Sequence, residues 1–277
     1  MLYLGIELQN GNEINSYIMI HFNKDKLAVE VHPNRITMGE RAARDVSYKI
    51  NEILCRKNEL NMVFAAAPSQ NEFLHALTSD RTIEWNRINA FHMDEYIGLR
   101  ADSPQSFGYY LDKHIFGKVP FKNVYYIDGK AVNTEEECER YGTLLSNTSI
   151  DIVCFGIGEN GHIAFNDPHV ANFNDSALMK VVDLDYNCRM QQVHDNCFAN
   201  LNDVPKYAYT LTIPMLMSAT NMFCIVPDDR KKEAVFNTVF APVDEHCPAT
   251  ILRNKNGVKL YLDNASASLL DLQVLIH

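Results

Sequence analysis

Side chains that can do chemistry follow four apolar segments of the sequence, each at the point where a buried strand would end. They are Ser69, Asp94 with Glu95, His162 with Asp167, and Lys231. Carboxylates and imidazoles transfer protons, whereas hydroxyl and ammonium groups bind anions. Because the carboxyl ends of parallel strands meet at one edge of a sheet, these side chains would converge there. The sequence therefore predicts a site that combines proton transfer with anion binding.

The segment Asp151–Pro168 carries the largest share of this chemistry. It opens with the apolar run Ile152–Phe155, which is typical of a strand buried on both faces. Three glycines follow and lead to His162; they let the backbone bend tightly and let a ligand approach closely. The histidine is either a core residue bonded to a backbone carbonyl or a catalytic group oriented by Asp167.

The same three glycines, at positions 156, 158 and 161, match the dinucleotide fingerprint G-x-G-x-x-G. That fingerprint needs a helix directly after it, whose N-terminus faces the pyrophosphate. Here Asn166–Pro168 interrupts the chain within one or two turns, so we expect no dinucleotide site. No H-x-H or H-E-x-x-H spacing occurs either, and we expect neither a metal nor a cofactor.

Asp94 has two interpretations. It could cap the turn after its strand, as many loop aspartates do. It could instead be a general base, because Glu95 and the aromatic flank of Phe91 and Tyr96 would raise its pKa.

Ser69 and Lys231 are candidate anion ligands. Ser69 and Glu72 form a capping-box pattern, so Ser69 either caps a helix or helps a loop and helix N-terminus bind phosphate. Lys231 lies in the first turn of a predicted helix, Asp229–Val239, within a charged run. It is either a solvated lysine or a cation that shares an anion with the helix N-terminus.

The composition is that of an ordinary globular protein. The chain has 277 residues, of which 47% are hydrophobic, and its net charge is −10. That charge argues against nucleic acid or an anionic membrane as a partner. Seven cysteines without a CxxC motif indicate reduced thiols in a cytoplasmic protein. We see neither a signal peptide nor an apolar run that could span a bilayer.

Strands and helices are predicted to alternate along the chain. We expect strands at Ser16–Phe22, Lys26–Val31, Met62–Ala67, Ile88–Met93, Val124–Ile127, Ile152–Phe155, Tyr207–Ile213, Met222–Val226 and Lys259–Leu262. We expect helices after the capping boxes at 37–40 and 69–72, and at Phe107–Phe116, Glu135–Leu145 and Asp229–Val239. This alternation predicts a single α/β domain over residues 1–277, with a Rossmann-like open, mainly parallel sheet and helices on both faces.

Two long motifs resemble the glucosamine-6-phosphate deaminase (isomerase) family, which is related to the 6-phosphogluconolactonases. They are Phe91–Leu99 (FHMDEYIGL) and Gly156–Pro168 (GIGENGHIAFNDP). The resemblance runs from about Phe64 to Asp263. It implies conversion of D-glucosamine 6-phosphate and water to D-fructose 6-phosphate and ammonia, with a small sugar phosphate as the partner. Assembly into a homo-oligomer is left open.

The resemblance also implies roles for individual residues. Asp94 matches the base that moves a proton between C2 and C1, and His162 matches the group that opens the sugar ring. Asp167 matches the acid that supports the histidine. The remaining matches are phosphate ligands, namely Arg189, Lys231 and the loop that contains Ala67 and Ser69.

The sequence departs from the family pattern at several positions. Asn160 stands where the family has an aspartate, and Ala67–Gln70 replaces the family's Gly-Ser-Thr-Pro loop. Lactone hydrolysis, deamination of another hexosamine phosphate such as galactosamine 6-phosphate, and a non-catalytic sugar-phosphate sensor therefore stay open as alternatives.

Overall fold

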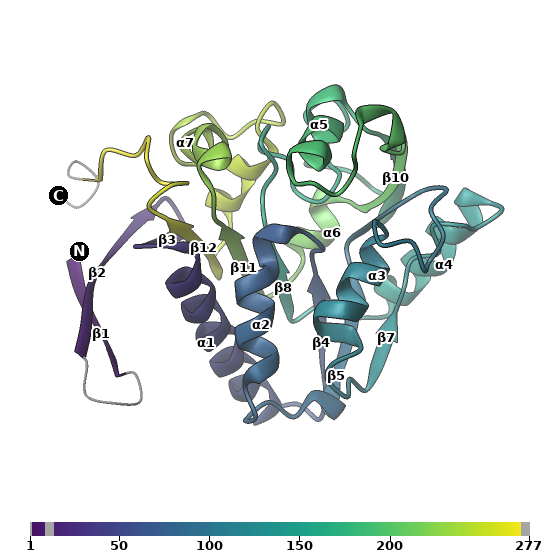
Figure 1. Ribbon diagram of the computed structural model, residues 1–277. Coiled ribbons are helices and arrows are strands. Elements are labelled where there is room, and N and C mark those ends of the chain that lie inside the picture. The colour runs from purple at the N-terminus through teal and green to yellow at the C-terminus, as the bar shows by residue number, and fades with distance from the viewer. Residues whose placement is uncertain (1, 9–13, 273–277) are drawn as a thin grey trace.

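The computed structural model of this chain describes residues 2–8 and 14–272. Its main feature is a nine-stranded sheet (Figure 1). The strands, in order across the sheet, are β1 (Leu2–Leu8), β2 (Ile14–Lys24), β3 (Leu27–His32), β12 (Val258–Asp263), β11 (Asn221–Val226), β8 (Ile152–Phe155), β4 (Leu60–Phe64), β5 (Ile88–His92) and β7 (Asn123–Tyr125). The pairings from β3 through β7 are all parallel, and β1, β2 and β3 pair antiparallel. The predicted mainly parallel sheet is confirmed.

Helices pack on both faces of this sheet. The face toward the viewer in Figure 1 carries α1 (Arg35–Leu54), α2 (Asn71–Ser79) and α3 (Phe107–Leu111), which continues as a π-helical turn at Asp112–Phe116. The other face carries α4 (Thr134–Ser146), α6 (Ile213–Met217) and α7 (Lys232–Phe240). Alternate strand residues enter two separate apolar clusters, with Val63, Val153 and Cys224 in one and Phe64, Cys154 and Phe223 in the other. A strand that is buried on both faces needs such a continuous apolar run.

A second sheet of three antiparallel strands, which the sequence did not predict, lies beyond the carboxyl ends of the main sheet. Its order is β6 (Asp94–Tyr96), β10 (Tyr207–Leu211) and β9 (Met179–Asp183), and α5 (Tyr186–His194) follows β9. The segment Tyr207–Ile213 is therefore a strand, but its expected place in the main sheet is wrong. The backbone N–H of Leu211 donates to the carbonyl of Met93, which fixes the point where the chain leaves β5.

Both predicted capping boxes are wrong. Asn34 caps α1 by accepting hydrogen bonds from the N–H groups of Ile36 and Thr37, so Thr37 lies inside the helix. Ser69 lies in a one-turn 3₁₀ helix, Pro68–Gln70, and α2 follows without a side-chain cap. Proline fixes φ at a first helical position, and so it starts the turn one residue before the expected cap.

Several other elements had no sequence signal, namely β1, β9, α5 and α6. As predicted, no helix follows the three glycines, since residues 156–168 form turns and a single β-bridge. Within the described ranges, no helix is both long and apolar enough to cross a membrane.

Candidate active site

A cavity lies at the carboxyl ends of four neighbouring strands, β11, β8, β4 and β5. Predicted site residues that follow each strand line the cavity: Lys231 after β11, His162 after β8, Ala67 and Ser69 after β4, and Asp94 after β5. A cation, an imidazole, a hydroxyl and a carboxyl group are thus brought into one space. The parallel topology produces this arrangement because all four loops leave the same edge of the sheet.

The imidazole of His162 is held by a buried carboxylate. Its Nδ1 lies 2.8 Å from Oδ1 of Asp167, which is fully buried. Burial alone would raise the pKa of Asp167, but the facing His162 and hydrogen bonds from His162 and Asn160 hold it below its usual value. An ionised Asp167 fixes the ring through Nδ1 and leaves Nε2 for the cavity.

Asn160 supports this pair without touching the imidazole ring. Its Nδ2 donates to Oδ1 of Asp167 at 2.9 Å and to Oδ2 of Asp185 at 3.3 Å. Its Oδ1 accepts the backbone N–H of His162 at 3.1 Å. The amide therefore has both a donor and an acceptor role here, and it fixes the carboxylate relative to the histidine's backbone.

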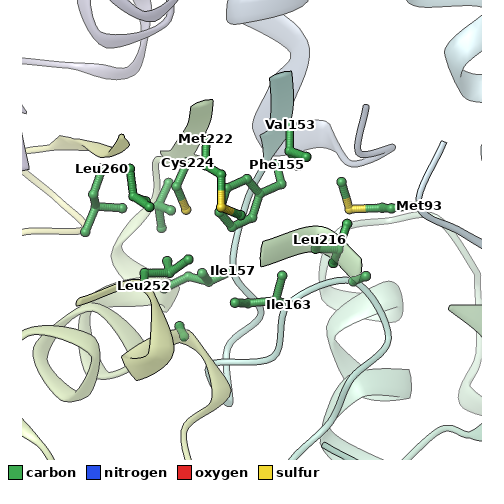
Figure 2. Packing of buried hydrophobic residues seen from close by; sticks show 14 of the residues in the cluster. Met93, Val153, Phe155, Ile157, Ile163, Leu216, Met222, Cys224, Leu252 and Leu260 are labelled. Atoms are coloured by element: carbon green, nitrogen blue, oxygen red, sulfur yellow. The ribbon is translucent and has the colours of Figure 1, made fainter. Parts of the chain in front are cut away.

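The histidine loop is fixed by a glycine and by the core. A Cβ atom at Gly158 would lie 2.2 to 2.4 Å from three atoms of the His162 ring, so only glycine allows this ring position. Ile157 and Ile163, on either side of the histidine, enter the apolar cluster that also contains Phe155 (Figure 2). The ring is therefore held against a backbone that is itself anchored in the core.

Asp94 is a buried carboxyl group with a raised pKa. Only 6% of the residue is exposed, and burial, followed by the charge of Glu95, raises its pKa well above the usual value. The rings of Phe107 and Phe165 line the cavity beside it. Once ionised, this carboxylate is poorly solvated and is a stronger base than one in water.

Glu95 points away from this cavity. Its carboxylate accepts hydrogen bonds from the N–H groups of Tyr96, Phe107 and Gly108 and from the hydroxyl of Ser106. It lines a different cavity, as expected when successive residues of a strand point to opposite sides. Glu95 therefore holds the start of α3 in place.

Lys231 is a buried cation without a close anionic partner. It is 5% exposed, and burial lowers its pKa. Asp195 and Glu159 favour its charged form, yet both face Arg230, at 2.9 Å and 3.9 Å. Within residues 2–8 and 14–272, its ammonium group makes no hydrogen bond or ion pair. The interpretation of Lys231 as a solvated lysine is wrong, and its position suits an anion bound in the cavity.

The loop after β4 forms another side of the cavity. Ala67 and Ser69 both line it, and the Ser69 hydroxyl accepts a hydrogen bond from Nε2 of Gln70 at 3.2 Å. The same Gln70 nitrogen donates to the carbonyl of Ile225, which ties the loop to β11. Because the first turn of a helix leaves N–H groups unpaired, this loop can offer backbone donors to an anion.

Arg189, expected among the phosphate ligands, does not line this cavity. Its Nη2 donates to the carbonyls of Leu201 and Val204, at 2.6 Å and 3.0 Å. The polar side chains that line the cavity without having been predicted are those of Arg35, Gln191, Gln192, Asp195, Asp228 and Arg230. Arg35 and the two glutamines lie in helices, where no motif marks a ligand. Arg230 adjoins Lys231 in the charged run, which could have indicated it.

Three buried ligand atoms are also close enough to hold a metal ion. They belong to His162, Asp167 and Cys188 and lie within 4.8 Å of one another. The 2.8 Å between Nδ1 and Oδ1 is a hydrogen-bond separation, shorter than the roughly 3.3 Å between two ligands of a tetrahedral zinc ion. Burial and the charge of Asp167 raise the pKa of Cys188 well above its usual value, which keeps the thiol protonated. The arrangement is that of an imidazole and a carboxylate in direct contact.

The sequence places this fold and cavity in a known family. Residues 33–261 match the model of the family described as glucosamine-6-phosphate isomerases/6-phosphogluconolactonase. This chain belongs to that family. A protein named glucosamine-6-phosphate deaminase from Listeria innocua serovar 6a is 37% identical over 234 residues, which cover 84% of this chain and 98% of the relative. One of the same name from Streptococcus pyogenes serotype M1 is 33% identical over 197 residues, covering 68% and 79%.

Solved structures of the family have the same fold. A monomeric glucosamine-6-phosphate deaminase superposes with a TM-score of 0.80 at 26% identity, covering 87% of this chain and 99% of that chain. A 6-phosphogluconolactonase from Thermotoga maritima superposes with a TM-score of 0.68 at 20% identity, covering 86% and 99%. At that identity the second likeness shows the fold alone.

Proposed function

We propose that this chain is a glucosamine-6-phosphate deaminase, which converts D-glucosamine 6-phosphate and water to D-fructose 6-phosphate and ammonia. The observation that carries the proposal is one cavity that holds an unpaired buried cation, a carboxylate-supported histidine and a buried carboxyl group. Relatives at up to 37% identity bear the same name. An isomerisation with deamination needs an anchor for the phosphate, a group that opens the ring, and a base.

Substrate binding begins with the phosphate. Lys231 follows β11, and the loop of Ala67 and Ser69 follows β4. These two strands flank β8, so both groups lie at the same end of the sheet and line the same cavity. The unpaired ammonium group gains a partner when the phosphate enters, which offsets the cost of its burial. Anchoring one end of the sugar places its reacting carbons near the other groups, and such positioning is worth several kcal/mol.

Ring opening is the role we assign to His162. Asp167, which Asn160 holds in place, lies at Nδ1 of the ring, so Nε2 is the nitrogen that exchanges a proton with the sugar. An imidazole nitrogen can both donate and accept a proton, which suits a group that gives up a proton and takes it back. The product of this step is the open-chain aldose with its amine on C2.

Asp94 is the proposed base of the isomerisation. Its ionised form takes the proton from C2, which gives an enolamine, and returns a proton to C1. Water then replaces the amine at C2, which leaves the ketone of fructose 6-phosphate and releases ammonia. Burial makes Asp94 a stronger base than a solvated carboxylate, because its charged form is poorly stabilised.

The test is a coupled ammonia assay with glucosamine 6-phosphate, galactosamine 6-phosphate and unphosphorylated glucosamine as substrates. We expect ammonia from glucosamine 6-phosphate at a rate well above that from the other two. If only galactosamine 6-phosphate released ammonia, the protein would be a deaminase of that sugar phosphate instead. Hydrolysis of 6-phosphogluconolactone without any ammonia release would contradict the deaminase proposal, and binding without turnover would indicate a sensor.

We also propose that the protein works in the cytoplasm. All seven cysteines lie in the described ranges and all are free, as in a reducing compartment.

The solved relative with the TM-score of 0.80 is monomeric, whereas this chain's oligomeric state is open to measurement. Light scattering coupled to size exclusion would determine it.

A further inference from the structure

Arg35 reaches the cavity from an element that no motif connects with it. It is the first residue of α1, and the N-cap of that helix, Asn34, fixes its first turn. The Arg35 side chain lines the cavity together with Ser69 and Lys231. The amino end of α1 therefore adds a guanidinium group to the side of the cavity where the proposed phosphate ligands lie.

The guanidinium group of Arg35 is held in one orientation. Its Nε lies 2.7 Å from Oε1 of Glu72, and its Nη2 donates to Oε2 of Glu72 at 2.9 Å and to the carbonyl of Pro68 at 3.0 Å. Among the described residues, Nη1 has no hydrogen-bond partner. One edge of the planar group is thus fixed to the loop and to α2, and the Nη1 donors are left for a ligand.

The charge of a bound phosphate calls for a second cationic ligand besides Lys231. A phosphate monoester carries about −1.5 to −2 charges near neutral pH, more than the single ammonium of Lys231 balances. Arg230 also lines the cavity but is held by Asp195 and Asp228, at 2.9 Å and 3.0 Å. Arg35 is held less tightly: among the described residues it forms an ion pair with Glu72 alone, whose side chain is 26% exposed, and its charge also lowers the pKa of Asp228.

We infer that Arg35 binds the substrate's phosphate together with Lys231 and thereby sets the preference for phosphorylated hexosamines. This inference rests on the proposed function for the identity of the sugar. Arginine suits the role because its flat, forked donors match phosphate oxygens. Glu72 holds the group in place beforehand, so less side-chain freedom is lost on binding.

The experiment compares Arg35→Gln, Arg35→Lys and Glu72→Gln with the wild type and with Lys232→Gln. Lys232 is a neighbouring cation that pairs with the exposed Asp229 and does not line the cavity. For each protein, steady-state kinetics give kcat and KM for glucosamine 6-phosphate, and calorimetry gives the Kd of inorganic phosphate. Thermal unfolding reports whether each variant is folded.

We expect Arg35→Gln to raise KM and the phosphate Kd about 10- to 100-fold, the size of a charge-assisted contact. Arg35→Lys should recover part of this loss, and Lys232→Gln should match the wild type. Glu72→Gln breaks the same ion pair but keeps the guanidinium, so it should change Kd far less than Arg35→Gln.

Two outcomes would overturn the role of Arg35. One is an equal phosphate Kd in the wild type and Arg35→Gln, and the other is an equal effect of Arg35→Gln and Glu72→Gln on Kd. A wild type that binds phosphate but releases no ammonia would instead contradict the proposed function. In that case, the phosphate Kd of the same variants still decides whether Arg35 is a ligand.

Discussion

At the scale of single residues, the groups that we propose for catalysis and binding are ones whose charged forms burial disfavours. Asp94 and Lys231 are both more than nine-tenths buried, and burial shifts the pKa of each toward the neutral form. Neither has the close partner of opposite charge that buried ion pairs usually have. Groups perturbed in this way cluster at functional sites.

Replacing Asp94 should lower activity and raise the stability of the folded protein. The pKa of Asp94 is about 4 in the unfolded state and higher in the folded state. Between these two pH values the unfolded chain has lost this proton and the folded protein still binds it. The free energy of unfolding therefore falls as pH rises through this range. We expect Asp94→Asn to lower ammonia release about 10²- to 10⁴-fold. It should also unfold at a higher urea concentration at pH 7, by a margin that shrinks toward pH 4. Unchanged activity would remove Asp94 from the mechanism.

Gly158→Ala should displace the His162 ring, because the added Cβ would lie 2.2 to 2.4 Å from ring atoms. We expect ammonia release to fall strongly while circular dichroism shows a folded protein. Gly142→Ala is the matched control, since its nearest new contact is at 4.0 Å. Its activity should equal that of the wild type, and full activity of Gly158→Ala would mean that the ring's position is unimportant.

Residue types at strand ends were predictable from the sequence, but helix-borne ligands were not. Asp94, His162 and Lys231 each follow an apolar run that indicates a strand, and the topology then brings them together. Arg35 enters the cavity from the first position of α1, and no local sequence pattern marks a ligand there. The resemblance to the family places Arg189 at the site, yet its side chain donates from α5 to backbone carbonyls of the segment after that helix.

At the scale of elements, the sequence indicates that a helix exists more reliably than where it starts. The apolar spacing predicts α1 correctly, whereas the capping-box pattern places its N-cap three residues too late. A Ser/Thr-x-x-Glu pattern matches residues inside a first turn as well as a true cap. The three-residue strand β6 was missed for a similar reason, because periodicity needs more residues than it has.

Stability measurements can separate the two candidate caps of α1. Asn34 accepts hydrogen bonds from two otherwise unpaired N–H groups, so Asn34→Ala should lower the free energy of unfolding by about 1 kcal/mol. Thr37→Ala should cost less, because the Thr37 hydroxyl bonds back to Asn34 and caps no N–H group. Urea titrations at equal protein concentration give both values, and the reverse ranking would favour the capping-box interpretation.

At the scale of the whole molecule, cationic side chains gather in one cavity of a chain whose net charge is negative. The chain carries −10 overall, yet its cavity gathers three cationic side chains from α1 and from the loop after β11, namely Arg35, Arg230 and Lys231. Composition alone predicted only that an anionic substrate would need such a cluster. The extent of a single domain over residues 1–277 stays a prediction.

Ligand-linked stability should reveal this cluster without an activity assay. A sugar phosphate at 100 times its Kd would stabilise the folded wild type by about 2.7 kcal/mol. Lys231→Met removes a buried, unpaired charge, so we expect a higher melting temperature without ligand and a much smaller rise with glucosamine 6-phosphate. Differential scanning calorimetry measures both shifts. An equal rise in the two proteins would exclude Lys231 as a ligand.

The pairing of β6 with β10 decides which acid faces the reaction cavity. Thr210 lies opposite Asp94, and Tyr209 lies opposite Glu95. A slip of this pairing by one residue would turn both side chains to the opposite face of β6, and so toward the other cavity. A longer acid would then meet the sugar, and the start of α3 would lose the carboxylate that holds it. The length of the connection between β5 and β6 therefore matters as much to the reaction as the aspartate itself, because it determines which acid faces the sugar.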